Sequence, residues 1–224
     1  MLQPYMRPSL RSIPPEESSE LAMIRLKRNL LAGLALTLTI SACDRSAPLP
    51  VHVHSLEEAL PTLEEAAQAW SSDAYLADVE VPLRDGYPGE RVIDAGFQSP
   101  SAPYESLLVT LREDDTLTTE IIPQTVPVIQ SSPITRDDWV LDSADALERA
   151  LDEEGRRFFE GHAESHCSFL KLERDTDSPG WPVVWRLTLT ECLGRGGVQH
   201  TVIDAITGEV IRRRQFGPFP SPTP

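Results

Sequence analysis

Alternating apolar and polar positions predict strands in two stretches of the sequence. In the first stretch the alternation covers residues 79–83, 92–97, 107–111 and 117–122. In the second stretch it covers residues 167–172, 183–189, 198–205 and 209–211. A period of two places the apolar side chains on one face of a sheet. We therefore expect each stretch to form a small sheet.

A helix is predicted ahead of the first set of strands. Its apolar stripe follows the spacing i, i+3, i+4 and i+7, at Leu63, Ala66, Ala67 and Trp70. Ser55 and Thr62 each begin a capping-box pattern. Because proline is tolerated at a helix entrance and not in its interior, Pro61 favours Thr62 as the start of the main helix.

A second helix is predicted ahead of the second set of strands. Asp142 or Ser143 caps it, and its apolar positions are Leu147, Ala150, Leu151 and Phe158. Trp70, Phe97 and Leu117 match Leu151, Trp185 and Val210 at offsets of 81, 88 and 93 residues. A steadily growing offset is typical of a tandem repeat with small insertions, and chance similarity of two helix-and-sheet units is the alternative. The predicted fold class is α+β, with two similar halves at residues 55–125 and 137–215, each a helix packed on a small antiparallel sheet.

The amino-terminal region combines a basic cluster, a short apolar run and a cysteine. A basic cluster is followed by an apolar run over residues 30–40, which is too short to cross a hydrocarbon core of roughly 30 Å. The run ends in Ile40-Ser41-Ala42-Cys43, which resembles the lipobox of bacterial lipoproteins, whose cysteine is acylated and becomes the first mature residue. An ordinary signal peptide cut nearby is the alternative.

This resemblance divides the rest of the chain. Residues 1–22 are interpreted as an over-long start or a disordered segment, residues 23–42 as the signal peptide, residues 43–54 as a lipidated tether and residues 216–224 as a proline-rich tail. The expected location is the bacterial cell envelope, facing the periplasm or the exterior, with inner and outer membrane both left open.

The charge excludes two classes of partner. The chain of 224 residues has 20 Lys and Arg against 35 Asp and Glu, a net charge of −15. Residues 1–42 contain five basic and three acidic residues, so the mature chain has 20 − 5 = 15 against 35 − 3 = 32, or −17. Such an acidic protein binds neither nucleic acid nor anionic lipid by charge. Membrane attachment therefore depends on acyl chains at Cys43.

In the second half, one predicted strand begins Pro182-Val-Val-Trp185, and the next strand ends in the turn Asp204-Ala-Ile-Thr207-Gly208-Glu209-Val210. This pattern resembles the PepSY domain, a family found in peptidase propeptides and many envelope proteins, and the resemblance covers residues 139–213. Asp204 can accept backbone hydrogen bonds across this turn, and Gly208 can take the positive φ where the chain reverses. The resemblance implies an antiparallel sheet with a helix across it and a binding or inhibitory role, and it supplies no catalytic residue.

The two remaining cysteines predict a disulfide. Cys167 and Cys192 each lie 12.5 residues from the midpoint of Pro179 and Gly180, in a strong turn sequence. If a hairpin closes there, the cysteines face each other at a Cα separation of roughly 4.5–5.5 Å, which a disulfide can span.

Few other residues suggest chemistry. His162, His166 and Cys167, with His52 and His54, could provide zinc ligands, but solvated histidines are the preferred interpretation. An EF-hand-like start at Asp175 fails because Arg186 occupies the position of the bidentate glutamate. No hydrolase or phosphate-loop motif occurs, so neither an enzyme nor a cofactor is expected.

The predicted function is therefore binding. Trp181 and Arg212 are the candidate contact residues. The expected partner is an envelope protein, with a peptidase as one candidate. The alternative is a small-ligand-binding or structural envelope lipoprotein.

Overall fold

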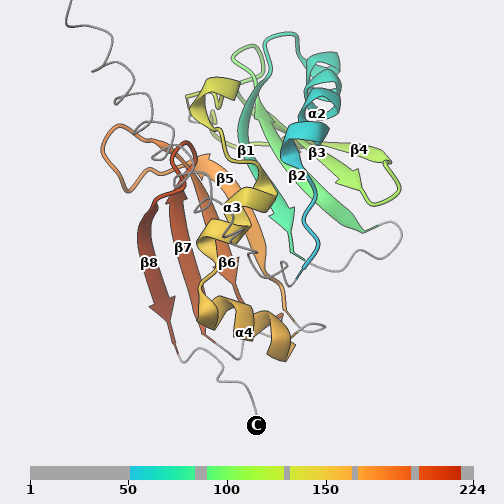
Figure 1. The fold of residues 1–224 in the computed structure, drawn as a ribbon. Helices are drawn as coiled ribbons and strands as arrows, with labels where there is room; N and C mark the ends of the chain where they lie inside the picture. The colour runs from blue at the N-terminus through green and yellow to red at the C-terminus, as the bar shows by residue number, and fades with distance from the viewer. Residues whose placement is uncertain (1–50, 84–89, 129–131, 163–165, 193–196, 218–224) are drawn as a thin grey trace, which may run out of the picture. The chain divides into compact units, whose positions relative to one another are not determined.

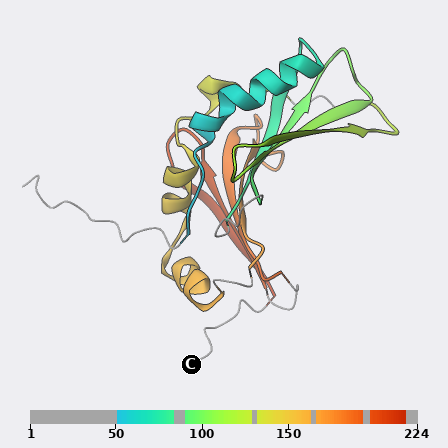
Figure 2. The ribbon, with the colours of Figure 1, turned by 90° about the vertical axis from the view of Figure 1, so that its right-hand side faces the viewer.

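The computed structural model describes residues 51–83, 90–128, 132–162, 166–192 and 197–217. Cys43, the segments 1–22 and 23–42, most of the tether and residues 218–224 of the tail lie outside these residues. The described part forms one antiparallel sheet of eight strands with helices on one of its faces (Figures 1 and 2).

The strands lie close to where the alternation of apolar residues predicts them. Their bounds are β1 Tyr75–Pro82, β2 Arg91–Gln98, β3 Glu105–Arg112, β4 Leu117–Pro123, β5 Phe169–Arg174, β6 Val183–Leu189, β7 Val198–Asp204 and β8 Val210–Phe216. The order across the sheet is β4-β3-β2-β1-β5-β6-β7-β8.

This order overturns the prediction of two halves with separate small sheets. β1 and β5, the first strands of the two stretches, pair with each other, with Val79 opposite Leu172 and Pro82 opposite Phe169. Hydrogen bonds therefore run without interruption through the whole sheet. Pairing across the boundary satisfies the backbone groups that two separate sheets would leave exposed at these edges.

The first helix, α2, spans Leu56–Trp70 and starts six residues before Thr62, the predicted start. Ser55 caps it, with its Oγ accepting a hydrogen bond from the N–H of Glu58 at 3.1 Å. Pro61 lies inside the helix. The preceding turn is kept because it buries two further leucines, Leu56 and Leu60, and this burial offsets the backbone hydrogen bond that proline cannot donate.

The second predicted helix is two helices. α3 spans Ser143–Ala150 and α4 spans Glu153–His162. The break falls at Asp152, whose Oδ1 accepts a hydrogen bond from the N–H of Gly155 at 2.8 Å. Asp152 thus acts as an N-cap, which interrupts one helix and starts the next in a new direction. A short 3-10 helix, Arg136–Asp138, precedes α3.

The core lies between the helices and one face of the sheet. α2 packs on β1, β2 and β3, and α3 packs on β6 and β7. The largest fully buried side chains include Trp139, Trp185, Phe97, Phe158 and Phe159. The indole of Trp185 also donates a hydrogen bond from Nε1 to the carbonyl oxygen of Leu141 at 2.9 Å, which ties the segment before α3 to the centre of β6. We call this side of the sheet the covered face.

Candidate binding face

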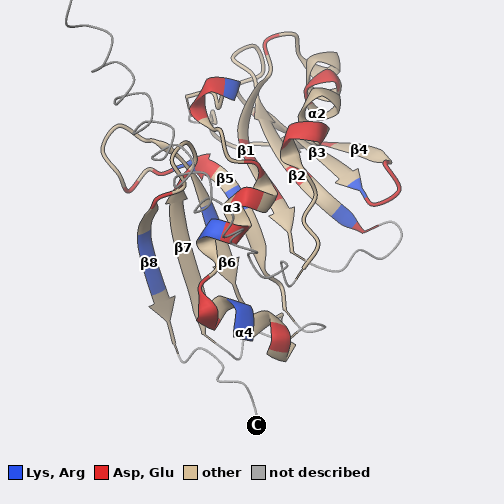
Figure 3. Cartoon of the chain, viewed as in Figure 1, with Lys and Arg blue, Asp and Glu red and all other residues tan. Residues whose placement is uncertain are grey.

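The opposite side of the sheet, which no described helix covers, is rich in charged side chains. One line of directly opposed residues crosses it and comprises Thr118, Thr110, Asp94, Glu80, Lys171, Arg186, Val202 and Arg212. We call this side the uncovered face. Figure 3 shows basic residues on β6 and β8, although the chain as a whole is strongly acidic.

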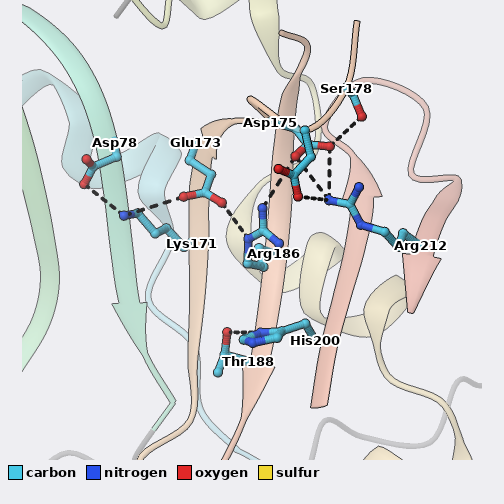
Figure 4. A network of polar contacts seen from close by, with 10 residues as sticks. Asp78, Lys171, Glu173, Asp175, Ser178, Arg186, Thr188, His200 and Arg212 are labelled. Atoms are coloured by element: carbon cyan, nitrogen blue, oxygen red, sulfur yellow. Dashed lines mark hydrogen bonds and ion pairs between the residues drawn. The ribbon is translucent and has the colours of Figure 1, made fainter. Parts of the chain in front are cut away.

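Alternating charges form an ion-pair network on this face (Figure 4). Lys171 Nζ lies 3.8 Å from Asp78 Oδ1 and 3.6 Å from Glu173 Oε2. Arg186 Nε donates to Glu173 Oε1 at 2.5 Å, and its Nη2 lies 3.7 Å from Asp175 Oδ1. Arg212 Nη2 donates to the same Asp175 oxygen at 3.1 Å. Six side chains therefore connect β1, β5, β6 and β8, and their three negative and three positive charges cancel.

Asp175 is the most buried member of the network, with 1% of its surface exposed. Burial by itself would raise the pKa of its carboxyl group. Hydrogen bonds from Ser178 Oγ at 2.6 Å and from Arg212 outweigh that effect, so the pKa lies below its usual value. Asp175 therefore stays charged and holds Arg212 in a fixed position.

On β1 and β2 the uncovered face has three acidic residues, Asp78, Glu80 and Asp94, whose charges are less fully paired than those of the network. Asp94 is paired, since it accepts hydrogen bonds from Arg91 at 2.5 Å and from Thr110 Oγ1 at 2.6 Å. Burial raises the pKa of Glu80, and the neighbouring Asp94 raises it further. Burial also raises the pKa of Asp78 and outweighs the opposite effect of Lys171. Negative charge is therefore only partly compensated on this side.

His200 lies on β7, on the uncovered face, between the strands that contain Arg186 and Arg212. Its Nδ1 is 3.0 Å from Thr188 Oγ1, and its ring makes an edge contact with Phe216. Partial burial lowers the pKa of His200, and the positive charge of Arg186 lowers it further. The imidazole of His200 is therefore protonated less readily than that of a histidine in water.

A half-open groove of about 470 Å³ lies on the uncovered face over β1, β2 and β3. Residues of β2, β3, β4 and the segment after β4 line it, among them Gly96, Leu108, Ile122, Gln124 and Val126. Asp78 and Gln98 place polar groups at the groove. The groove thus adjoins the ion-pair network through Asp78.

The turn that carries the PepSY resemblance has the geometry expected from its sequence. Asp204 Oδ1 accepts hydrogen bonds from the N–H of Ile206 at 2.9 Å and of Thr207 at 2.7 Å. Gly208 has a φ of 73°, and a Cβ at this position would lie 2.4 Å from Arg149 Cδ. Glycine is therefore required both by the backbone angle and by the close approach of α3. Glu209, the last residue of the motif, is exposed.

The two candidate contact residues have different surroundings. Trp181 is 49% exposed and lies in the β5–β6 turn with a φ of 50°. Its backbone oxygen accepts a hydrogen bond from Arg174 Nη1 at 3.1 Å. Arg212 instead donates a hydrogen bond to the buried carboxylate of Asp175. Sequence reasoning missed the ion pairs of Lys171, Glu173 and Arg186. The available signal was in β5, where Lys171 and Glu173 alternate with apolar residues, whereas Arg186 is the single charged residue of β6.

The predicted disulfide between Cys167 and Cys192 is confirmed, with a Cα separation of 4.7 Å. The hairpin register is shifted from the predicted one, because His166 lies opposite Glu191 and Phe169 opposite Thr188. The residue opposite Cys167 is thus Thr190, and Cys192 lies diagonally beyond it. The disulfide closes the end of the hairpin that is remote from the turn.

Two of the histidines that were considered and not favoured as zinc ligands contact acidic side chains. His162 Nε2 lies 3.2 Å from Glu191, and its ring stacks on Phe158. His54 Nε2 lies 2.8 Å from Glu113. Among the residues that the structure describes, no group of three or more His, Cys, Asp or Glu side chains is placed to bind a metal ion. Within the same ranges, no helix has the length and apolar character needed to span a membrane.

The comparisons with known proteins identify no family. The sequence matches no protein-family model, and a search of curated proteins finds no match. The structure resembles a crystal structure from Clostridium difficile 630 described as "a putative lipoprotein (CD1622)", with a TM-score of 0.46 and 12% identity over 74% of this chain and 94% of that chain. None of these comparisons supports the PepSY resemblance or a tandem repeat.

Proposed function

We propose that the protein is a lipid-anchored envelope protein, without enzymatic activity, that binds a protein partner through the uncovered face of its sheet. The lipobox at Cys43 supports the anchor. The observation that carries the binding proposal is the neutral ion-pair network beside an apolar groove, on a sheet face that no described helix covers.

The network suits a surface that is covered when a partner docks. Burying an unpaired charge costs several kcal/mol, whereas these charges are already paired with one another. Arg186 and Arg212 are held by carboxylates, so little side-chain freedom remains to be lost on docking. The surface is polar and ordered before the partner arrives.

The groove supplies the apolar contact that such an interface needs. Binding energy concentrates where a few apolar side chains fill well-packed pockets, with polar contacts around them. Leu108 and Ile122 line the groove, and Ile122 is 37% exposed. An apolar side chain of the partner would fill this groove while the rest of the partner lies over the network.

A small apolar ligand in the same groove is the second candidate. The volume of about 470 Å³ falls within the range of small-molecule sites. A peptidase as the partner follows only from the PepSY resemblance, and the proposal does not depend on it.

The test is site-specific photocrosslinking of the full-length protein in the membranes of expressing cells. A crosslinker at Leu108 probes the groove, and one at Gln68, which is exposed on α2, serves as the matched control. A discrete protein adduct from Leu108 that is absent from Gln68 is expected. Adducts of equal yield at both positions, or at neither, contradict the proposal.

The partner identified in this way then allows a quantitative test. Leu108→Glu should weaken binding of the purified partner at least tenfold, about 1.4 kcal/mol, while Gln68→Glu leaves it unchanged. If native mass spectrometry of the protein instead finds a bound small molecule that Leu108→Glu removes, the second candidate is correct.

The anchor has its own test. Metabolic labelling with a fatty-acid analogue should mark the parent protein, and Cys43→Ser should abolish the label. A labelled Cys43→Ser variant would refute acylation at this cysteine.

A further inference from the structure

The two edge strands of the sheet have opposite characters. β8 contains three consecutive arginines, Arg212 to Arg214. β4 has the sequence Leu-Thr-Thr-Glu-Ile-Ile-Pro, without Lys or Arg, and its Ile121 is 51% exposed. Charged residues on an edge strand, lysine especially, discourage pairing with another strand, and exposed apolar residues without them favour it.

The register of the β3–β4 hairpin shows which backbone groups of β4 point away from the sheet. The N–H of Arg112 donates to the oxygen of Thr116, and the N–H of Gln124 donates to the oxygen of Tyr104. Even-numbered residues of β4 therefore direct their N–H and C=O groups toward β3. The odd-numbered residues Leu117, Thr119 and Ile121 direct theirs outward, along an exposed edge.

We propose that β4 pairs antiparallel with β4 of a second copy of this chain, about a two-fold axis at Thr119. Thr119 then lies opposite Thr119 of the second copy, and Leu117 lies opposite Ile121 on both sides of the axis. Each of these pairs joins residues whose backbone groups point outward, so each exchanges two hydrogen bonds. The pairing makes one continuous sheet from two molecules.

The side chains fit this register. Leu117 and Ile121 meet as apolar cross-strand pairs on the covered face. On the uncovered face, Glu120 lies opposite Thr118, so no like charges are directly opposed. A two-fold axis at Glu120 would instead place Glu120 against its own copy and bring Pro123, which has no N–H, into the ladder. Thr119 is therefore the favoured centre.

β8 cannot pair with itself in the same way. An axis within Arg212–Arg214 places arginine opposite arginine, which is destabilising. Pairing of β4 with β8 of another molecule would be head-to-tail and would continue into a ring or a filament, not a closed dimer. Pairing through β4 alone uses the same surface on both molecules and closes as a dimer.

Cysteine crosslinking in the membranes of expressing cells tests the register directly. Thr119→Cys should form a disulfide-linked dimer on mild oxidation, because opposed residues of a hydrogen-bonded pair lie at Cα distances that a disulfide spans. Thr118→Cys is the matched control, since Thr118 faces Glu120 of the second copy and not itself. The parent protein, oxidised in parallel, supplies the background.

The proposal fails if Thr119→Cys forms dimers no faster than Thr118→Cys. It also fails if Thr119→Cys crosslinks with cysteines placed in β8 of a second molecule. A mixture of Leu117→Cys and Ile121→Cys proteins should yield the mixed dimer in preference to either homodimer.

Sedimentation of the detergent-solubilised full-length protein provides the second measurement. Ile121→Lys should raise the dimer dissociation constant about tenfold or more, because it opposes a lysine to Leu117 across the axis. Val210→Lys, at an exposed position of the other edge strand, should leave it unchanged. A protein that is monomeric at all concentrations, or equal effects of the two variants, overturns the proposal.

Discussion

The two faces of the sheet achieve burial by different means. On the covered face, helices α2 and α3 lie over apolar side chains such as Trp185, which is fully buried. On the uncovered face, Val184 and Val202 are 0% and 1% exposed with no described helix above them. Val202 is flanked in register by Arg186 and Arg212. Long charged side chains that are held by ion pairs thus cover apolar residues where no described helix lies over them.

This difference teaches that the ion-pair network contributes to structure and not only to surface charge. Where a helix covers the sheet, burial of the apolar side chains depends on packing. Where paired charged side chains cover it, burial depends on the geometry of the ion pairs. Substitutions should therefore separate the two contributions, and the covered face should show the larger effects.

Trp185→Ala should cause the largest loss of stability, about 3–5 kcal/mol, because it leaves a cavity beneath α3 and removes the hydrogen bond to Leu141. Urea unfolding followed by circular dichroism measures the loss. Trp181→Ala, in the same hairpin but exposed, is the control and should change stability by less than about 0.5 kcal/mol. Similar losses in the two variants would contradict the assignment of the core to the covered face.

Removal of the disulfide should come next, at about 3 kcal/mol for the Cys167→Ser, Cys192→Ser double variant. The disulfide acts chiefly by restricting the unfolded chain over a sequence separation of 25 residues, so it should stabilise both faces alike. The loss caused by Trp185→Ala should therefore be the same with and without the disulfide. A coupling above about 1 kcal/mol between the two changes would show that the bridge also shapes the covered face.

Asp175→Asn tests the uncovered face and should cost about 2 kcal/mol, since it leaves Arg212 without its buried charged partner. Asp177→Asn is the matched control, because Asp177 is 59% exposed and lies 3.6 Å from the same guanidinium. Its effect should not exceed about 0.5 kcal/mol. Equal losses of stability from the two substitutions would mean that the network does not contribute to the stability of the fold.

The smallest expected effect is the pH dependence of the uncovered face. The pKa of His200 in the folded protein lies below its unfolded value of 6.5, so the unfolded chain takes up this proton first. Stability should fall as pH drops below about 6.5 and until His200 is protonated in the folded state. The raised pKa values of Asp78 and Glu80 act with the opposite sign and increase stability as pH falls toward the acid range.

Urea unfolding between pH 7.5 and 5 separates these contributions. His200→Gln should remove the decrease and leave only the increase from the two carboxyl groups. A decrease that persists unchanged in His200→Gln would show that another group causes it.

Much of the secondary structure could be predicted because its causes are local. The period-two alternation placed all eight described strands, and Ser55 was one of the two starts considered for α2. The error at Pro61 arose because the cost of a proline inside a helix was weighed without the burial of Leu56 and Leu60, which only the folded protein reveals. The break at Asp152 had a capping signal in the sequence that the apolar periodicity concealed.

The sheet topology and the candidate site could not be predicted in the same way. Nothing in the local pattern of β1 indicates that it pairs with β5, because this pairing is decided by which two edges meet after each hairpin has formed. The ion-pair network depends on that pairing, since Lys171 on β5 reaches Asp78 on β1 only across the shared boundary. The disulfide was predictable because it lies within one hairpin, although its register was not.

The pairing of β1 with β5 also has a kinetic consequence. Every other neighbouring pair of strands is consecutive in the chain, so each can form by closing a short loop. The β1–β5 pair, with Pro82 opposite Phe169, must close a loop between residues that are 169 − 82 = 87 positions apart. Loop closure of this length is entropically costly before its contacts form, and non-local pairing is slow. Before this pairing forms, β1 and β5 are both unpaired edge strands, and this step should set the vulnerability of the folding chain to aggregation and proteolysis.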